Sequence, residues 1–240
     1  MTHYPFPDSR GTKIAFAAFF TAMLFLARDS MFTTAVIGFE KAQFLMLGVI
    51  CLLGVAFLIV NRRYLTQILK DRRMIVAGIA AAVLLLPMLV KRDWQLMYFS
   101  VLLCLLTAVL LSYFLTVREA AKYYVVILSV LGAYSVLAAY ILRIGVDRGA
   151  YAVPVFRNSM GFEFHNFFLS IVPDTYVKNR NFGIFREPGV YQFFLITALY
   201  LNNYEVEWKK PWQLWLVNGI LAATMVSTFA TGGVAEMGLL

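Results

Sequence analysis

The segment KNRNFGIFREPGVYQ, residues 178–192, holds the densest group of side chains that could do chemistry. Its charged members are Lys178, Arg180, Arg186 and Glu187. A guanidinium group can hold phosphate oxygens through two parallel hydrogen bonds, so this segment could contact phosphates. Its glycines, Gly183 and Gly189, would permit a backbone turn or the close approach of a phosphate, although simple loop punctuation explains each of them equally well.

The same residues also suit a structural role at the start of a helix. A hydrophobic stretch begins directly after Glu187, and Pro188 fits the first turn of a helix, where no backbone N–H is needed. The Glu187 carboxylate would complement the positive end of that helix. Glu187 is therefore either a helix cap or a proton acceptor. The neighbouring cations either bind a substrate or contact lipid phosphates.

Other polar residues upstream are further candidates. His165 could accept a proton, because imidazole exchanges protons near neutral pH, but it could equally be a packed or interfacial histidine. Arg143, Arg148, Arg157 and Lys178 could line the path of an anionic substrate, and each alone also fits a cation that contacts lipid. We see no cluster of metal-ligand residues in the sequence, so we expect neither a metal nor a cofactor.

Composition places these residues in a membrane protein. Of 240 residues, 61% are hydrophobic and 14% are charged, against about 25% charged in a typical soluble domain. The hydrophobic residues occur in blocks of about 17 to 21, which is long enough to cross a hydrocarbon core of about 30 Å as helices. The net charge of +8 would suggest nucleic acid in a soluble protein. Here anionic lipid head groups account for most of it, and we expect no nucleic acid.

The hydrophobic blocks predict an all-α polytopic bundle of about seven transmembrane helices, since only helices satisfy their own backbone in lipid at this segment length. We expect a single membrane domain over residues 1–240. The expected helices are 14–35, 42–60, 74–90, 97–117, 123–142, 189–204 and 212–231. Arg28 and Asp29 interrupt the first, so that this segment either crosses with the pair near an interface or re-enters.

Charge orients the bundle. The segment 61–73 carries five Lys or Arg residues, which places it in the cytoplasm under the positive-inside bias. Alternate crossings then put the N-terminus in the cytoplasm and the segment 143–188 on the outer, periplasmic side.

That outer segment is the one large loop, between the fifth and sixth helices. Long loops are usually functional or disordered, and its aromatic residues argue against disorder. Four of its apolar residues recur at i, i+3, i+4 and i+7: Phe164, Phe167, Phe168 and Ile171. This spacing predicts a short helix that either lies on the membrane surface or caps the bundle.

The entrance to the sixth helix resembles a motif of the O-antigen polymerase and O-antigen ligase superfamily. The residues that fit its pattern R-x-x-G-x-F-x-E-P are Arg180, Gly183, Phe185, Glu187 and Pro188. The next helix is similar to a Ser/Thr/Gly-containing helix of many polysaccharide polymerases. The residues that carry this second likeness are Ser227, Thr228, Thr231 and Gly232.

The resemblance implies a bacterial inner-membrane enzyme that transfers a glycan from undecaprenyl pyrophosphate to an acceptor lipid-linked repeat unit. Arg180 and Arg186 would stabilise the pyrophosphate leaving group, and Glu187 or His165 would accept the acceptor's proton. Further substrate contacts would come from Lys178, Gly183 and Arg157. The implied partners are the lipid-linked oligosaccharide, membrane lipids, a chain-length regulator and a flippase.

Three alternatives stay open. A ligase of the same superfamily would pass the glycan to lipid A core or to a protein. A transporter of lipid-linked sugars would need ionisable groups inside the membrane, which the second to fifth predicted helices lack in their interiors. A non-catalytic envelope assembly subunit fits the end of the sequence at Leu240, soon after the seventh predicted helix. Because members of the superfamily commonly have more helices, we expect an N-terminal portion of a longer protein.

Overall fold

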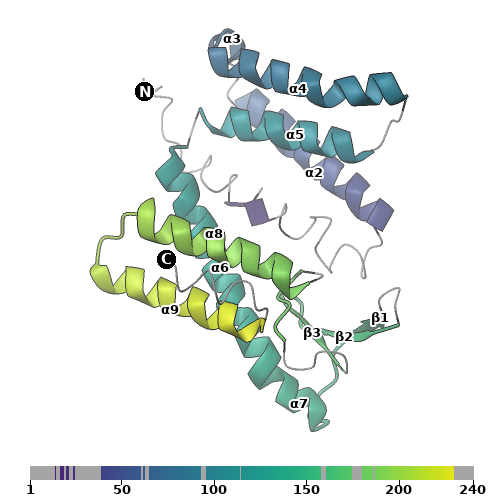
Figure 1. Cartoon of the computed structure of the whole chain (residues 1–240), viewed down its shortest axis with the longest axis vertical. Coiled ribbons are helices and arrows are strands. Elements are labelled where there is room, and N and C mark those ends of the chain that lie inside the picture. Colours follow the sequence, from purple (N-terminus) through teal and green to yellow (C-terminus); the bar gives the residue numbers. More distant parts are fainter. Residues whose placement is uncertain are drawn as a thin grey trace. The chain divides into compact units, whose positions relative to one another are not determined.

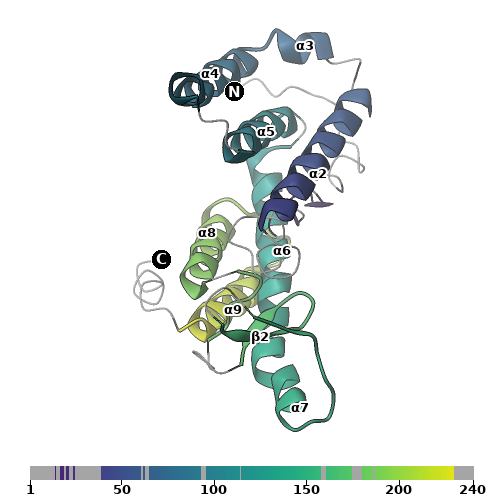
Figure 2. The same cartoon turned by 90° about the vertical axis from the view of Figure 1, so that its right-hand side faces the viewer.

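The structure is a computed structural model, mostly helical, in which the chain divides into two compact units. The first comprises residues 1–26 and 40–116, and the second comprises 27–39 and 117–240. The residues that the structure describes are 14, 17–18, 20–21, 24, 39–60, 62, 65–92, 96–113, 115–157, 161–174, 180–185 and 187–229. Figures 1 and 2 show the elements from two sides.

The first unit holds nearly all of α2 and three further helices. The bounds are α2 (Phe39–Val60), α3 (Leu65–Leu69), α4 (Arg72–Lys91) and α5 (Leu96–Leu111). Helices α4 and α5 pack against each other. Asp71 caps α4 by accepting a hydrogen bond from the Arg73 backbone N–H at 2.8 Å. Helix α3 lies within the cationic segment 61–73, which therefore contains a short turn of helix between two hydrophobic ones.

The second unit is built around one long helix. The helix α6 (Val117–Leu137) continues through a π-helical turn, η3 (Ala138–Leu142), into α7 (Arg143–Asp147). The helices α8 (Pro188–Tyr204) and α9 (Pro211–Ser227) pack on α6 and on each other (Figures 1 and 2). Helices α6 and α9 approach closely at Gly132, where an added Cβ would lie 2.7 Å from Thr224 Oγ1. Glycine at this position therefore lets the two helices pack closely.

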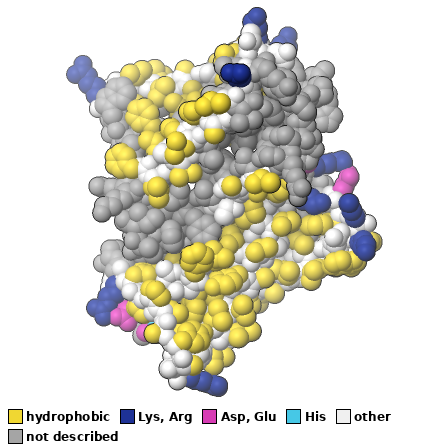
Figure 3. All heavy atoms as spheres, turned by 180° about the vertical axis from the view of Figure 1, so that it is seen from behind, with side chains coloured by type: hydrophobic (Ala, Val, Ile, Leu, Met, Phe, Trp, Pro, Cys, Tyr) yellow, Lys and Arg dark blue, Asp and Glu magenta, His cyan; other side chains and the backbone are white. Residues whose placement is uncertain are grey.

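Two helices in the described part of the chain are long and apolar enough to cross a membrane. They are α4, with 20 residues, and the continuous helix 117–147, with 31 residues. The second is about 46 Å long at the standard helical rise, so it exceeds a hydrocarbon core by about 16 Å. Its exposed hydrophobic residues include Val126, Val130, Leu137 and Ile141. On the face drawn in Figure 3, hydrophobic side chains cover much of the described surface.

A small sheet lies beside the C-terminal end of this long helix. Its strands are β1 (Val155–Arg157), β2 (Glu163–Asn166) and β3 (Ile171–Pro173), antiparallel and in the order β1-β2-β3. One side of the hairpin buries Phe164 and Ile171 against Phe182. On the other side, Phe167 and Val172 pack against Ala138 of η3. The prediction of an all-α fold is therefore wrong for this segment.

The predicted amphipathic helix at Phe164–Ile171 is also wrong, because the four apolar residues do not share a face. Phe164 and Ile171 lie in one cluster, Phe167 lies in the other, and Phe168 is 77% exposed. Asn166 favours a turn, since its side chain accepts the Phe168 backbone N–H at 2.9 Å. The β-branched pair Ile171 and Val172 then returns as a strand.

An observed helix overlaps each of the predicted segments 42–60, 74–90, 97–117, 123–142, 189–204 and 212–231. Most of the predicted helix 14–35 lies outside the described residues. The predicted loop 143–188 differs most at its start, because the helix continues to Asp147 instead of ending at residue 142. Arg143 faces Asp147 at 3.4 Å one turn later, which supports this extra turn. Arg143 is therefore a helix residue.

Candidate functional site

The described motif residues, 180–185 and 187–188, precede and begin α8, and neighbouring elements form hydrogen bonds with their backbone. The Asn181 backbone N–H donates to the Ser227 carbonyl oxygen, at the end of α9, at 2.9 Å. The Ile171 backbone N–H, on β3, donates to the Gly183 carbonyl oxygen at 2.7 Å. The segment is thus tied to the sheet and to α9 before it enters α8.

Gly183 is required by the path of this segment. Its φ is +56°, in the left-handed region that glycine adopts without strain. Its N–H donates to the Asn181 side-chain oxygen at 2.9 Å. An added Cβ would lie 2.6 Å from the ring of Tyr191. The prediction that Gly183 permits a turn is confirmed, whereas Gly189 lies in the first turn of α8 and has open space around it.

The two other uncharged motif residues are buried. Phe185 is 1% exposed and stacks on Phe194 of α8, with the ring centroids 4.7 Å apart. Pro188 is the first residue of α8, as its fixed φ and missing N–H predict. These residues anchor the chain at the entrance to the helix.

The charged motif residues differ from them in exposure. Arg180 and Glu187 are exposed. Glu187 occupies the N-cap position of α8, but its side chain makes no capping hydrogen bond to the described first turn. At this position the carboxylate can complement the positive end of the helix through its charge. Arg186 and Lys178 lie outside the described residues.

Beneath Arg180 lies a buried polar network, which we name the Asn181 network: Asn181, Ser135, Tyr191 and Ser227. The Asn181 amide nitrogen lies 2.8 Å from Ser135 Oγ and 2.9 Å from Ser227 Oγ. The Tyr191 hydroxyl lies 3.1 Å from Ser135 Oγ. All four residues are at most 5% exposed. The sequence carried a signal for this network, because Ser135 and Tyr191 are polar groups inside hydrophobic segments that need buried partners.

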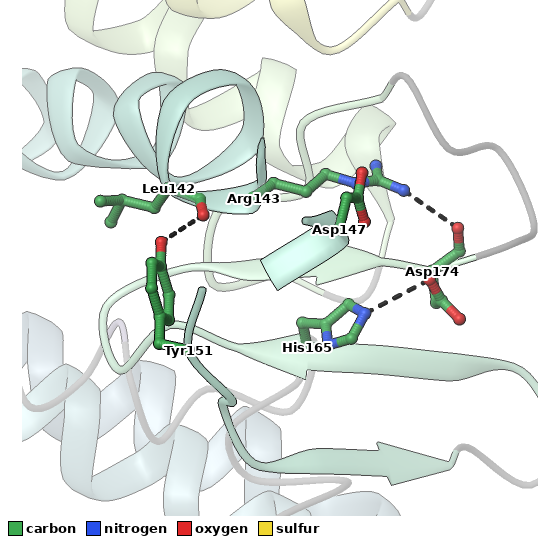
Figure 4. A network of polar contacts seen from close by, with 6 residues as sticks. All are labelled: Leu142, Arg143, Asp147, Tyr151, His165 and Asp174. Carbon is green, nitrogen blue, oxygen red and sulfur yellow. Dashed lines mark hydrogen bonds and ion pairs between the residues drawn. The ribbon is translucent and has the colours of Figure 1, made fainter. Parts of the chain in front are cut away.

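A second polar cluster joins the sheet to α7 (Figure 4). His165, on β2, points toward Asp174, with its Nε2 atom 3.3 Å from the Asp174 carboxylate. Arg143 donates from Nη2 to the Asp174 carbonyl oxygen at 3.0 Å. The other imidazole nitrogen of His165 is buried and has no hydrogen-bond partner among the described residues. His165 is therefore packed, with its Nδ1 atom buried and its Nε2 atom facing the Asp174 carboxylate.

Arg157, the other candidate for substrate binding, faces a carboxylate across the strands. Arg157 and Glu163 are paired in the β1–β2 register, and the Arg157 Nε atom donates to Glu163 Oε1 at 2.7 Å. The Arg157 side chain is 71% exposed. An anionic substrate at this position would have to compete with Glu163.

The described residues contain no group of three or more His, Cys, Asp or Glu side chains that could hold a metal ion. The site therefore consists of an exposed Arg180 and Glu187 on a backbone fixed by the Asn181 network. No protein-family model, curated protein or solved structure matches this chain.

Proposed function

We propose that this chain is a polysaccharide polymerase of the O-antigen polymerase type, which transfers a glycan from undecaprenyl pyrophosphate to an acceptor lipid-linked repeat unit. The observation that carries the proposal is the contrast in exposure within residues 180–188. Gly183, Phe185 and Pro188 are buried, whereas Arg180 and Glu187 are exposed. A fixed backbone therefore presents a guanidinium and a carboxylate at the surface, as preorganised electrostatic catalysis requires.

The position of Arg180 along the axis of α6 would place its side chain near phosphates at the outer edge of the hydrocarbon core. Arg118, near the start of α6, forms an ion pair with Glu207 in the loop between α8 and α9. Asn181, next to Arg180, bonds to Ser135 on the same helix α6. The rise along the helix from Arg118 to Ser135 is about 26 Å. This separation is close to the hydrocarbon thickness of about 30 Å. If Arg118 lies at the head groups of one membrane face, Arg180 therefore lies near the head groups of the other face.

The proposal includes the bilayer and its orientation. We assign the chain to the bacterial inner membrane, with about seven crossings and a cytoplasmic N-terminus. The cationic segment 61–73 supports this orientation, as do the cations Arg118 and Lys122 at the end of α6 far from the motif. The two long apolar helices and the hydrophobic residues exposed along them support contact with lipid.

In the proposed reaction, an acceptor hydroxyl oxygen attacks the anomeric carbon of the donor sugar. The bond from that carbon to the pyrophosphate oxygen breaks, and undecaprenyl pyrophosphate leaves with the bonding electron pair. Arg180 and Arg186 hold the phosphate oxygens and stabilise their negative charge. Glu187 accepts the proton of the hydroxyl. His165 is the second candidate for that proton, although its Nε2 atom already faces Asp174.

The donor half of this reaction is common to polymerases and ligases of the superfamily. A ligase would use the same Arg180 and Arg186 toward the pyrophosphate, and would pass the glycan to lipid A core or to a protein. The nature of the acceptor therefore distinguishes the two reactions, and the polymer itself is the product to measure.

The proposal is tested by replacing Arg180 with alanine in the source cell and measuring the length of the surface polysaccharide on gels. We expect Arg180→Ala to abolish polymer while the protein stays in the membrane fraction. Arg72→Ala is the matched control, because Arg72 is an exposed arginine at the start of α4 and belongs to no proposed contact. Normal polymer length in the Arg180→Ala strain would refute the assignment.

A further inference from the structure

Asn181, the residue directly after Arg180, is almost completely buried, with 1% of its surface exposed. Its side-chain nitrogen donates to the hydroxyl oxygens of Ser135 and Ser227 at 2.8 and 2.9 Å. Its side-chain oxygen accepts the Gly183 backbone N–H at 2.9 Å. Its own backbone N–H donates to the Ser227 carbonyl oxygen. The backbone next to Arg180 is therefore held from several directions.

The direction of these hydrogen bonds makes the position specific for an amide. Ser135 Oγ donates its proton to the Gly132 carbonyl oxygen at 2.8 Å, and Ser227 Oγ donates its proton to the Thr224 carbonyl oxygen at 2.5 Å. A hydroxyl has one proton, so toward Asn181 both serines act as acceptors. Asparagine meets them with its two N–H groups. Aspartate, of the same shape, would place carboxylate oxygens against two acceptors.

The Asn181 side chain also joins elements that are far apart in the sequence. Ser135 lies on α6, and Ser227 is the last residue of α9. Gly183 begins the turn that leads into α8. The position of Arg180 relative to these three helices is therefore set by the residue that follows it.

We propose that Asn181 is a positioning residue for Arg180, fixing the backbone from which the guanidinium reaches the pyrophosphate of a lipid-linked donor. This inference rests on the proposed function and deepens it. A donor group held in place before the ligand arrives binds more strongly than one that must be ordered on binding. Loss of the Asn181 side chain leaves the cation in the chain but removes the side-chain hydrogen bonds that hold its backbone.

The test measures binding of farnesyl pyrophosphate, a short polyprenyl pyrophosphate, to the full chain in lipid nanodiscs. We expect Arg180→Ala and Asn181→Ala each to weaken binding about 10-fold, the size of one charge-assisted hydrogen bond. We expect the double variant to bind no more weakly than Arg180→Ala alone, because Asn181 acts through Arg180. Asn181→Asp should behave like Asn181→Ala although it keeps the side-chain volume.

Asn202→Ala is the matched control for the loss of a buried asparagine. Asn202, on α8, is 0% exposed. Its side-chain nitrogen donates to Asn218 Oδ1 at 2.8 Å, and its oxygen accepts the Trp208 indole N–H at 2.8 Å. We expect Asn202→Ala to lower the unfolding temperature as Asn181→Ala does, and to leave binding of farnesyl pyrophosphate unchanged.

The outcomes separate the inference from the function on which it rests. Wild-type binding in Asn181→Ala beside weakened binding in Arg180→Ala would overturn the inference and leave the proposed function standing. Equal weakening in Asn181→Ala and Asn202→Ala would also overturn it, because the effect would then be general destabilisation. Wild-type binding in Arg180→Ala would overturn the proposed function. If Asn181→Ala fails to fold, Ser227→Ala, which removes one acceptor, decides the inference in the same assay.

Discussion

The backbone of Gly183 lies directly against the ring of Tyr191, so that a Cβ built on this glycine would come within 2.6 Å of Tyr191 Cε1. Tyr191 is buried in α8, and its hydroxyl contacts Ser135 of α6. The turn of the motif, the helix that follows it and the long helix of the second unit therefore meet at one point. A change at Gly183 is transmitted to the backbone that carries Arg180.

We predict that Gly183→Ala destabilises the protein and lowers polymer formation. The left-handed φ of +56° costs an alanine about 1–2 kcal/mol, and overlap with the Tyr191 ring adds to this. Thermal unfolding of the purified protein measures the loss. Gly189→Ala is the control, since Gly189 lies in α8 with no atom near its Cβ position among the described residues. A Gly183→Ala protein as stable as the Gly189→Ala protein would contradict the account.

We predict that Gly132→Ala pushes α6 and α9 apart, because the new methyl group would lie 2.7 Å from Thr224 Oγ1. The expected loss of stability is about 1–3 kcal/mol, as for other overpacked contacts. Thr224→Ala should restore most of it by removing the hydroxyl that the methyl meets. Unfolding of the two single variants and the double variant measures the coupling. Strictly additive losses would mean that the two residues are not in contact.

Replacing Phe168, at the tip of the β2–β3 hairpin, with glycine should make the hairpin more stable. Its φ is +68°, a conformation that L side chains rarely adopt, and its side chain is 77% exposed. Phe168→Gly should therefore stabilise the hairpin by about 1 kcal/mol, and Phe168→Val, which is β-branched, should weaken it. Hydrogen exchange at the Phe167 amide, which donates to the Ser170 carbonyl oxygen, reports the change. Faster exchange in Phe168→Gly would rule out strain at this position.

Glutamine substitutions distinguish the two candidate proton acceptors. We expect Glu187→Gln to abolish polymer formation, because Glu187 is exposed beside the motif arginine and the amide cannot accept a proton at the pH of the cell. We expect His165→Gln to keep it, because His165 faces Asp174 in a packed cluster. The length of the surface polymer is measured in both strains. The opposite pattern would assign the proton transfer to His165.

The helices and the place of the motif could be predicted from the sequence because their causes are local. Hydrophobic blocks of sufficient length form helices in lipid wherever they occur, and Pro188 marks the start of α8 by its own geometry. A turn at Gly183 was one of the roles left open for this glycine, and its positive φ has the same kind of local cause. None of these features depends on a distant partner.

The sheet and the Asn181 network depend on distant partners, so local patterns could not predict them. The strands have three or four residues and become stable by packing on Ala138 of η3 and on Phe182. Asn181 reaches Ser135 and Ser227, each 46 residues away in the sequence. The spacing of the four apolar residues in 164–171 matched a helical period by chance, and the Asn166 side chain instead stabilises a turn.

The most direct measurement is a reconstituted reaction. The purified chain in nanodiscs is supplied with a lipid-linked repeat unit, and both the glycan length and the release of undecaprenyl pyrophosphate are followed. The account predicts chain growth with one undecaprenyl pyrophosphate released per unit added, lost in Arg180→Ala and kept in Arg72→Ala. Chain growth that is unchanged in Arg180→Ala, or wild-type protein that neither extends the glycan nor releases the pyrophosphate, would contradict it.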